Sequence, residues 1–178
     1  MSFIPTARLL LRPMTEADAP AVYAYAKNPA VGPNAGWKPH QSLLETESLM
    51  QSIFLSRRTV WGIVLREGNH LIGSIGLTPD PARKNNRIRM LGYSLAAERW
   101  GRGYMTEAAR AVLAHGFGTL SLDLISATCF PNNARSRRVL EKCGFVYEGR
   151  LRRAERLWND EVRDLLCFSI AREEFRVR

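Results

Sequence analysis

The 178-residue sequence has few of the residues that build metal centres and disulfide frameworks. Its three cysteines, Cys129, Cys143 and Cys167, form no Cys-x-x-Cys pair, and its three histidines do not cluster with them along the chain. This spacing differs from that of zinc sites and of small folds held by disulfides. We therefore expect no metal site, and we expect buried, reduced thiols.

Long apolar runs are absent too, as are repeats, low-complexity tracts and long linkers. No run approaches the roughly 20 residues that a helix needs to cross a bilayer. The stretch 1–19 holds one short apolar patch, which Arg12 and Pro13 interrupt, and it has no cleavage signal. We expect a cytoplasmic protein without a membrane segment, whose residues 1–178 form a single domain.

Acidic residues are too few to balance the basic ones, since 17 Asp and Glu stand against 26 Lys and Arg, a net charge of +9. Such an excess favours anionic partners such as nucleic acid, an acidic protein or a phosphorylated cofactor. A basic surface that only keeps the protein soluble explains the net charge equally well. A nucleic-acid binder is disfavoured, because no aromatic and basic platform and no groove-reading helix is visible.

The apolar fraction of 46% is enough for a sizeable core, and periodicity and turn residues divide the chain into strands and helices. Strands are expected at 6–14, 87–95 and 122–130, with hairpins at 59–80 and 145–171 that turn near Gly68-Asn69 and Asn159-Asp160. Helices are expected at 15–29, 42–57, about 104–117 and 132–145, the last closed by Gly144. This order predicts an α+β fold with parallel neighbours where a helix joins the strands at 87–95 and 122–130.

The turn Gly101-Arg102-Gly103 lies directly before the third of these α-helices. A helix N-terminus has unpaired N–H groups and a partial positive charge, and glycine lets the backbone approach a ligand closely. Together with Arg99 and Arg102, these features favour a bound anion such as a pyrophosphate. A dinucleotide fingerprint is excluded by Thr106, and a Walker loop by the lack of Gly-Lys-Ser/Thr. The alternative is a tight connection between strand and helix without a ligand.

A second motif follows the next predicted strand. Its residues are Asn133, Ser136, Leu140, Glu141, Lys142, Gly144 and Phe145. With this motif and Trp100–Met105, the chain resembles the GNAT superfamily of acyl-CoA-dependent N-acetyltransferases. The stretches 8–19 and 100–108 are similar to one branch of it, the ribosomal-protein alanine/serine N-acetyltransferases (Rim-like).

The resemblance implies a GNAT fold, in which a mixed, mostly antiparallel sheet of about seven strands is flanked by about four helices and strands four and five splay apart. It implies acetyl-CoA as co-substrate and no metal. The implied contacts with acetyl-CoA fall on one set of residues: the strand edge Leu91, Tyr93 and Leu95 for the pantetheine, then Arg99, Gly101, Arg102, Gly103, Tyr104, Met105 and Thr106 for the pyrophosphate, and Asn133 with Ser136 near the thiol.

The sequence departs from the family pattern at two positions. The glutamate that many relatives have on strand four is Met90 here, and the tyrosine that many have on the last helix is Leu140. In the Rim-like branch a serine at the position of Ser136 is thought to meet the thiol, so Ser136 is the expected catalytic contact of the thiolate. Its alternative is a serine that bonds only backbone at a helix start.

The general base is chosen among several carboxylates. Glu98 is the candidate that we retain, although it is also explained as a solvated residue. Glu107 suits the dipole of its helix better than it suits chemistry, and Glu148 follows the second motif. A missing base need not abolish activity, because orientation of a neutral amine by itself supplies several kcal/mol.

The acceptor site is expected between the first two helices and at the closing hairpin. Trp37, Tyr93 and Trp158 are its candidate walls, and packing in the core or the hairpin is the alternative for each. The basic stretch 150–156 is either a solvated strand edge or a docking surface for an acidic protein or the ribosome.

The reaction that the resemblance implies is acetyl transfer from acetyl-CoA to a primary amine, and we expect a protein N-terminal α-amine. A small-molecule amine (an amino acid, an antibiotic or a polyamine) is the enzymatic alternative, and the net charge disfavours the polyamine. A CoA-binding module without catalysis is the other alternative. Nucleic acid is expected only through a ribosomal target, and the protein is expected to be a monomer or a homodimer.

Overall fold

The computed structural model describes residues 2–176. They form two compact units, which we call the first unit (Met1–Gly76 and Tyr93–Ala108) and the second unit (Leu77–Gly92 and Ala109–Arg178). The prediction of a single domain over residues 1–178 stays a prediction. No helix among the described residues is long and apolar enough to span a bilayer.

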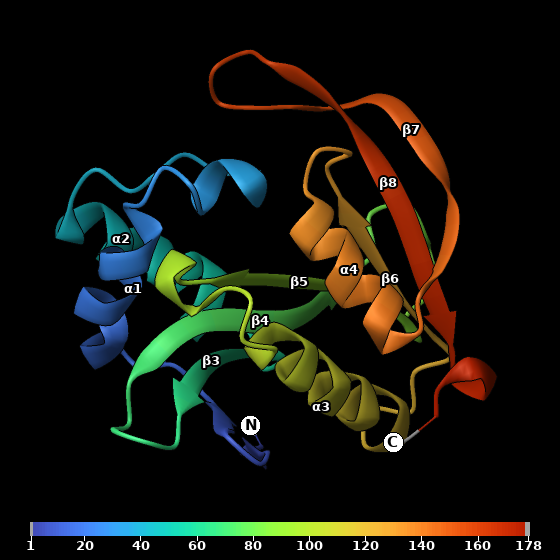
Figure 1. The fold of residues 1–178 in the computed structure, drawn as a ribbon, viewed down its shortest axis with the longest axis horizontal. Helices are drawn as coiled ribbons and strands as arrows, with labels where there is room; N and C mark the ends of the chain where they lie inside the picture. Colours follow the sequence, from blue (N-terminus) through green and yellow to red (C-terminus); the bar gives the residue numbers. More distant parts are fainter. Residues whose placement is uncertain (1, 177–178) are drawn as a thin grey trace. The chain divides into compact units, whose positions relative to one another are not determined.

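The strands are β1 (Ile4–Pro5), β2 (Leu9–Arg12), β3 (Val60–Leu65), β4 (Leu71–Pro79), β5 (Ile88–Leu95), β6 (Leu124–Cys129), β7 (Val146–Arg156) and β8 (Val162–Ala171) (Figure 1). The α-helices are α1 (Ala19–Ala26), α2 (Leu43–Met50), α3 (Tyr104–Gly118) and α4 (Ala134–Cys143). Short 3-10 turns are η1 (Glu16–Asp18), η2 (Gly32–Asn34), η4 (Ala97–Arg99) and η5 (Arg172–Glu174), and the π-helical turn η3 (Gln51–Leu55) follows α2 directly.

The strands form one sheet in the order β1-β2-β3-β4-β5-β6-β8-β7. β5 and β6 pair in parallel, and the pairs β1–β2, β2–β3, β3–β4, β6–β8 and β7–β8 are antiparallel. The expected α+β fold with a mixed, mostly antiparallel sheet and four α-helices is confirmed for the described residues.

The described residues contain eight strands rather than the expected seven, because 4–12 forms two short strands. A turn separates them, in which the amide of Thr6 donates to the carbonyl of Leu9 (2.9 Å) and the amide of Leu9 donates back to the hydroxyl of Thr6 (2.9 Å). A strand of two residues shows no alternation of apolar and polar side chains, so periodicity does not detect it.

The helix expected from residue 15 starts with the 3-10 turn η1, and α1 follows it from Ala19. Asp18 accepts a hydrogen bond from the Thr15 amide (2.8 Å) and two from the guanidinium of Arg12 (2.6 and 2.8 Å). Behind α1, a core of buried side chains joins the helices to the strands of the first unit. Its members are Met14, Ala19, Val22, Tyr25, Ala26, Val31, Met50 and Ala96.

The β3–β4 hairpin turns where Gly68-Asn69 predicts it. Gly68 and Asn69 have φ values of +72° and +52°, the left-handed region that Asn and Gly tolerate best. This turn sets Val60 opposite Gly76 and Ile63 opposite Gly73.

In the second unit, β5 and β6 share only a short parallel ladder. It runs from the pair Ile88–Leu124 to the pair Met90–Ser126. β5 continues to Leu95 and β6 to Cys129, yet no further pair joins them in the described part of the chain. The expected parallel pairing is thus confirmed, and the ladder stops where the splay between these strands was expected.

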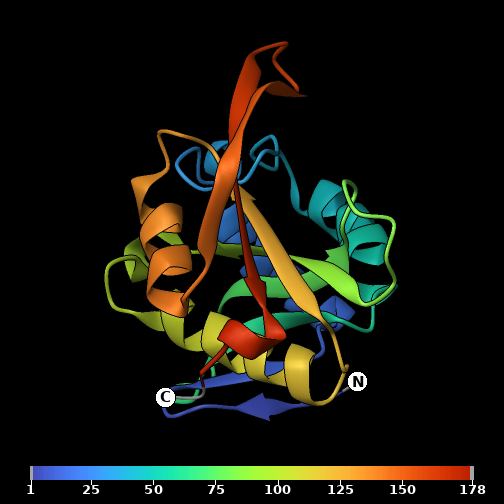
Figure 2. The same cartoon turned by 90° about the vertical axis from the view of Figure 1, so that its right-hand side faces the viewer.

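The β7–β8 hairpin is the longest of the second unit and extends beyond α4 (Figure 1). Figures 1 and 2 together show α4 on one face of β6 and β8 and the 80–87 segment on the other. A bulge between Tyr147 and Gly149 leaves Glu148 opposite no β8 residue. A second irregularity, between Leu151 and Glu155, sets Arg153 at a φ of +51°.

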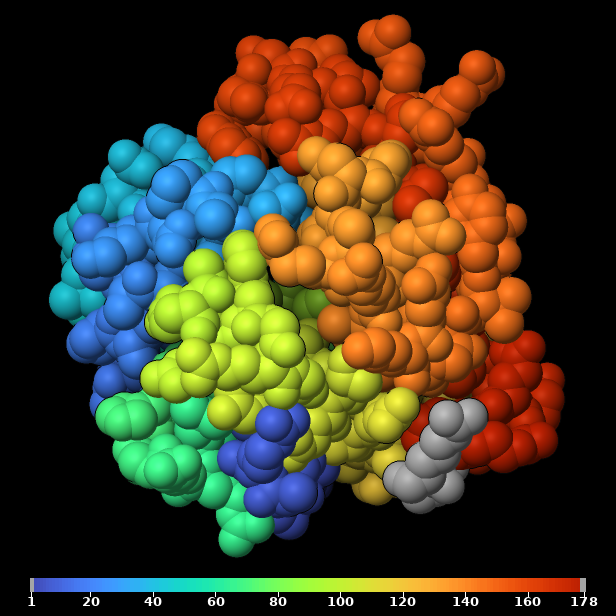
Figure 3. Space-filling view, viewed as in Figure 1, coloured from blue at the N-terminus to red at the C-terminus, as the bar shows by residue number. Residues whose placement is uncertain are grey.

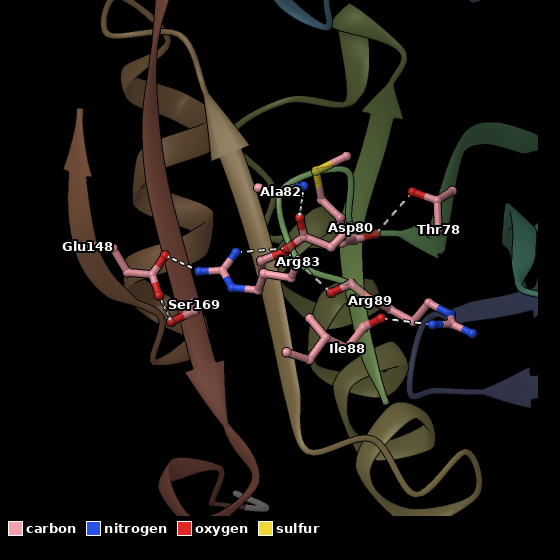
Figure 4. Close-up of polar contacts among 10 residues, drawn as sticks. Thr78, Asp80, Ala82, Arg83, Ile88, Arg89, Glu148 and Ser169 are labelled. Atoms are coloured by element: carbon pink, nitrogen blue, oxygen red, sulfur yellow. Dashed lines mark hydrogen bonds and ion pairs between the residues drawn. The ribbon is translucent and has the colours of Figure 1, made fainter. Parts of the chain in front are cut away.

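Buried polar groups tie the 80–87 segment to the sheet (Figure 4). Asp80, whose side chain is 3% exposed, accepts from Ser126 (2.6 Å) and from Arg83 (2.8 Å). Arg83 also pairs with Glu148 (2.5 Å), which accepts from Ser169 (2.8 Å). Burial by itself would raise the pKa of Asp80, but these hydrogen bonds and the charge of Arg83 outweigh it, so the pKa lies below its ordinary value.

We predict that Asp80→Asn lowers the free energy of unfolding at pH 7 by about 2–4 kcal/mol, because it leaves Arg83 and Ser126 imperfectly paired in a buried place. The folded-state pKa of Asp80 is depressed, so its contribution is present above the unfolded-state value of about 4 and is lost as the pH falls through the folded value. Urea unfolding should therefore show a smaller difference between wild type and variant at pH 3 than at pH 7.

Asp123→Asn is the matched control, since Asp123 pairs with Arg87 while 49% of its side chain is exposed. We expect it to change stability by less than about 1 kcal/mol. Equal losses in the two variants would show that burial of the Asp80 network contributes nothing.

Candidate functional site

The turn between β5 and α3 is held by hydrogen bonds within the first unit. The amide of Ala96 donates to the carbonyl of Ile72 (2.8 Å), and the amide of Arg99 donates to that of Ala96 (3.0 Å). The indole N–H of Trp100 donates back to the carbonyl of Leu95 (2.8 Å). The turn therefore leaves β5 in a fixed direction.

Gly101 and Gly103 are both in the left-handed region, with φ values of +75° and +81°. A Cβ at Gly101 would meet no heavy atom within 4 Å, and one at Gly103 would meet only Arg8 Nη2, at 3.4 Å. Glycine is therefore selected by the backbone conformation, and the space in front of both residues is open.

α3 starts directly after this turn. In its first turn the amide of Glu107 donates to the carbonyl of Gly103 (3.0 Å). Within residues 2–176, the amides of 102–105 donate no hydrogen bond to another part of the chain. Because Gly101, Arg102 and Gly103 are exposed, these donors and the positive end of the helix dipole can bind an anionic group.

The remaining residues expected around this anion site differ in exposure. Tyr104 and Thr106 are half-buried, and Met105 is buried with its side chain in the core. Arg99 is half-buried, and its Nε atom has no hydrogen-bond partner among the described residues. Arg102 is the exposed cation of the turn.

The β5 segment that precedes the turn alternates between core and exposed positions. Leu91 and Leu95 are buried at 3% and 7% exposure, Tyr93 is half-buried, and Gly92 is exposed. A Cβ added at Gly92 would meet no heavy atom within 4 Å. Space thus lies beside this strand at Gly92, close to the end of its ladder with β6.

The second motif forms the start of α4. Asn133 is the N-cap, and its side-chain oxygen accepts from the amide of Ser136 (3.1 Å). The helix ends at Gly144, whose φ is +90°. Leu140 is fully buried, so this chain uses the position for packing. Asn133 and Ser136 belong to the second unit, whereas the Gly-Arg-Gly turn belongs to the first.

A family model described as an acetyltransferase (GNAT) domain matches residues 8–146 of this sequence. The chain belongs to the GNAT acetyltransferase family. A relative from Bacillus subtilis (strain 168), named uncharacterized N-acetyltransferase YoaA, is 35% identical over 153 residues, which cover 84% of this chain and 85% of the relative.

Solved structures of GNAT proteins share the fold. A GNAT-family acetyltransferase from Bacillus anthracis is similar with a TM-score of 0.86 and 28% identity, over 97% of this chain and all of that one (100%). A ribosomal L7/L12 α-N-protein acetyltransferase, RimL, in complex with coenzyme A has a TM-score of 0.78 over 96% of this chain and 98% of that one. At 23% identity, RimL shows the fold alone.

Family membership makes this chain an N-acetyltransferase, and GNAT acetyltransferases use acetyl-CoA as co-substrate. The open, donor-rich anion site at the start of α3 fits the phosphates of that molecule. No group of three His, Cys, Asp or Glu side chains among residues 2–176 is arranged to hold a metal ion.

Three carboxylates are candidates for the general base of this GNAT enzyme, and they lie in different surroundings. Glu98 is exposed in η4. Glu148 is bonded to Arg83 and Ser169, so it stabilises the sheet. Glu107 is bonded to two residues of the β1–β2 segment.

Sequence reasoning missed Glu155, the residue that follows the second irregularity of β7. Burial raises the pKa of Glu155, and Arg163, its partner across the strands, opposes this only in part. A carboxyl group whose pKa lies above its ordinary range is a candidate for proton transfer. Glu155 lies inside the basic stretch 150–156. A charged residue in such a stretch predicts only contact with solvent, so the sequence gives no signal for its burial.

The two tryptophans expected in the acceptor site lie in different surroundings. Trp37 packs against the core of the first unit and contacts the ring of His40 (5.2 Å between centroids). Trp158 is 42% exposed in the loop of the β7–β8 hairpin. Packing in the core therefore accounts for the position of Trp37, whereas the exposed side chain of Trp158 can contact an acceptor.

The three cysteines form no disulfide among the described residues. Burial raises the pKa of both the Cys129 and the Cys143 thiol to about 11, and it also raises the pKa of Cys167. Thiolate chemistry is therefore disfavoured at neutral pH.

We predict that Gly101→Ala lowers the free energy of unfolding by about 1–2 kcal/mol, because an alanine in the left-handed region is strained. Gly118→Ala is the control, since a Cβ there also meets no heavy atom within 4 Å but lies in α3 without a positive φ. Chemical denaturation should leave Gly118→Ala unchanged or more stable. A loss in both variants would mean that φ does not select the glycine of the turn.

Proposed function

We propose that this N-acetyltransferase acetylates the α-amino group at the N-terminus of a protein, as a ribosomal-protein type of GNAT enzyme. The donor side of the proposal depends on one observation, the unpaired amides at the open turn before α3. The acceptor side depends on charge and on the exposed part of the β7–β8 hairpin.

On the donor side, acetyl-CoA supplies the acetyl group as a thioester. We assign its pyrophosphate to the amides of 102–105, with Arg99, Gly101 and Thr106 around them. Its pantetheine is assigned to the backbone edge of Leu91–Leu95, as in strand addition. Asn133 and Ser136 are assigned to the end that holds the sulfur.

On the acceptor side, β7 presents a basic surface that consists of Arg150, Arg152, Arg153 and Arg156, all exposed. Together with the exposed Trp158 and the net charge of +9, it suits an acidic protein. A polyamine would be repelled. Trp37 and Tyr93 stay candidate walls of the amine site.

Transfer forms a C–N bond and breaks a C–S bond, while the amine loses a proton and the sulfur gains one. We assign the Ser136 hydroxyl to a hydrogen bond with the departing thiolate, and the sulfur takes its proton from solvent, to which the base returns the proton of the amine. For the proton of the amine we favour Glu155, which lies on β7 between the exposed Arg153 and Arg156 and whose pKa is raised by burial, over the exposed Glu98.

The acceptor class is tested with the wild-type protein. We expect calorimetry to detect acetyl-CoA binding and thermal unfolding to show a raised Tm with the ligand present. Thiol release should then be faster with N-terminal peptides, above all acidic ones, than with amino acids, aminoglycosides or polyamines at equal concentration. Faster turnover of any small amine would refute the proposal of a protein acceptor. Tight binding of acetyl-CoA without turnover on any acceptor would refute the proposal that the protein catalyses acetyl transfer.

The base is tested by the pH dependence of kcat/KM. A base must be deprotonated, so the rate should fall as the pH drops through its pKa, and Glu155→Gln should remove that limb and lower kcat by about 100-fold or more. Glu161→Gln, a nearby carboxylate that pairs with Arg163, should keep the wild-type profile. If Glu155→Gln leaves the pH dependence of kcat/KM unchanged, and Glu98→Gln removes its fall at low pH, the base is Glu98.

A further inference from the structure

The β1–β2 segment reaches the start of α3 through the carboxylate of Glu107. This carboxylate accepts from the Thr6 hydroxyl (2.7 Å), from the Arg8 amide (2.8 Å) and from the guanidinium Nε of Arg8 (2.7 Å). In Figure 3 the dark-blue N-terminal residues lie against the yellow-green residues of this region. Residues about 100 positions apart are thus joined at one place in the first unit.

Arg8 has further contacts with the turn itself. Its Nη1 donates to the carbonyl of Arg102 (3.0 Å), and its guanidinium lies over the ring of Tyr104, 4.5 Å from the centroid. Its Nη2 lies 3.4 Å from the place that a Cβ on Gly103 would occupy. One guanidinium therefore contacts the carboxylate of α3, the backbone of the turn and the ring of the first helical residue.

The hydrogen bond to the Arg102 carbonyl fixes a peptide plane. In a planar trans peptide the C=O and the following N–H point in opposite directions. With the Arg102 carbonyl directed at Arg8, the amide of Gly103 must point away from Arg8. Glycine at φ +81° has little conformational preference of its own, so the hydrogen bond from Arg8 helps to hold the orientation of this peptide.

Charge gives Arg8 a second effect. Glu107 is in the first turn of α3, close to the place where an anion would bind. Burial by itself would raise the pKa of Glu107, but bonds from Thr6 and Arg8 and the charge of Arg8 outweigh it, so the pKa is lowered and the group is ionised at neutral pH. Without Arg8, this carboxylate would repel a phosphate at the helix N-terminus.

We propose that Arg8 is a positioning residue for the phosphates of acetyl-CoA: it orients the Arg102–Gly103 peptide so that the Gly103 amide faces the phosphate, and it neutralises Glu107. The proposal rests on the proposed donor site at this turn. It assigns Arg8 no contact with the reacting atoms.

Lysine is a sharp test of the proposal. Lys has the same charge but a single ammonium, and it cannot donate in the planar fork that reaches Glu107 and the Arg102 carbonyl at once. We expect Arg8→Lys and Arg8→Ala to weaken coenzyme A binding, measured by calorimetry, by about 10-fold or more, because an oriented charged donor set is lost.

Arg66→Ala is the matched control. Arg66 also contacts the β1–β2 segment, through a hydrogen bond from its Nη1 to the Thr6 carbonyl (3.1 Å), but none of its hydrogen bonds within residues 2–176 reaches the turn. We expect its affinity for coenzyme A to stay within about twofold of wild type, as an exposed surface contact is worth little.

A phosphate-free donor separates positioning from damage to the fold. With S-acetylpantetheine, kcat/KM of Arg8→Lys should equal that of wild type, while kcat/KM with acetyl-CoA should fall and the Tm without ligand should stay unchanged. Wild-type affinity in Arg8→Lys, or an equal loss with both donors, would overturn the role of Arg8. No binding of coenzyme A to the wild-type protein would instead refute the donor site itself.

Discussion

The amides at the start of α3 have no partners inside their own helix, and the arrangement around them follows from this. The first four or so amides of a helix have no partner in its hydrogen-bond ladder, and here the amide of Glu107 reaches back to the carbonyl of Gly103. No side chain among residues 2–176 caps the amides of 102–105. The chain places two left-handed glycines before them, so that the backbone turns sharply and the donors stay accessible. Leaving donors unpaired is unfavourable when they are buried, so the turn lies at an exposed place.

In the second unit, charged side chains lie within and beside the sheet and need partners there. Asp80 is almost completely buried, and its charge is compatible with the fold because Arg83 and Ser126 bond to it. The bulge in β7 directs Glu148 to the same group. Further along β7, a second irregularity precedes Glu155, which has no comparable set of donors and whose pKa is therefore raised by burial. Two carboxylates of one strand thus have different hydrogen-bond partners, because the two irregularities of β7 place them in different surroundings.

Much of the local structure could be predicted from particular residues. Gly68-Asn69 predicted a hairpin turn, Gly144 a helix end, and Ser42 a helix start, whose hydroxyl accepts from the Glu45 amide. These predictions succeed because each depends on the conformation of one or two residues. Other features could not be predicted. The short strand β1 has no periodicity, Trp37 was ambiguous between wall and core, and Glu155 was hidden among arginines, since burial depends on the residues that pack around a side chain.

The sequence by itself determined the order of strands and helices, the two motifs and the family that they indicate, because glycine positions, caps and hydrophobic spacing act over short distances along the chain. Only the tertiary structure decided which distant side chains support those motifs. Arg8 and Thr6 bond to Glu107, and Arg83 bonds to Asp80 and Glu148, through contacts that no local pattern encodes. The physical reason is that hydrogen bonds and burial act through space, so the partner of a charged side chain is fixed only when the strands have taken their register.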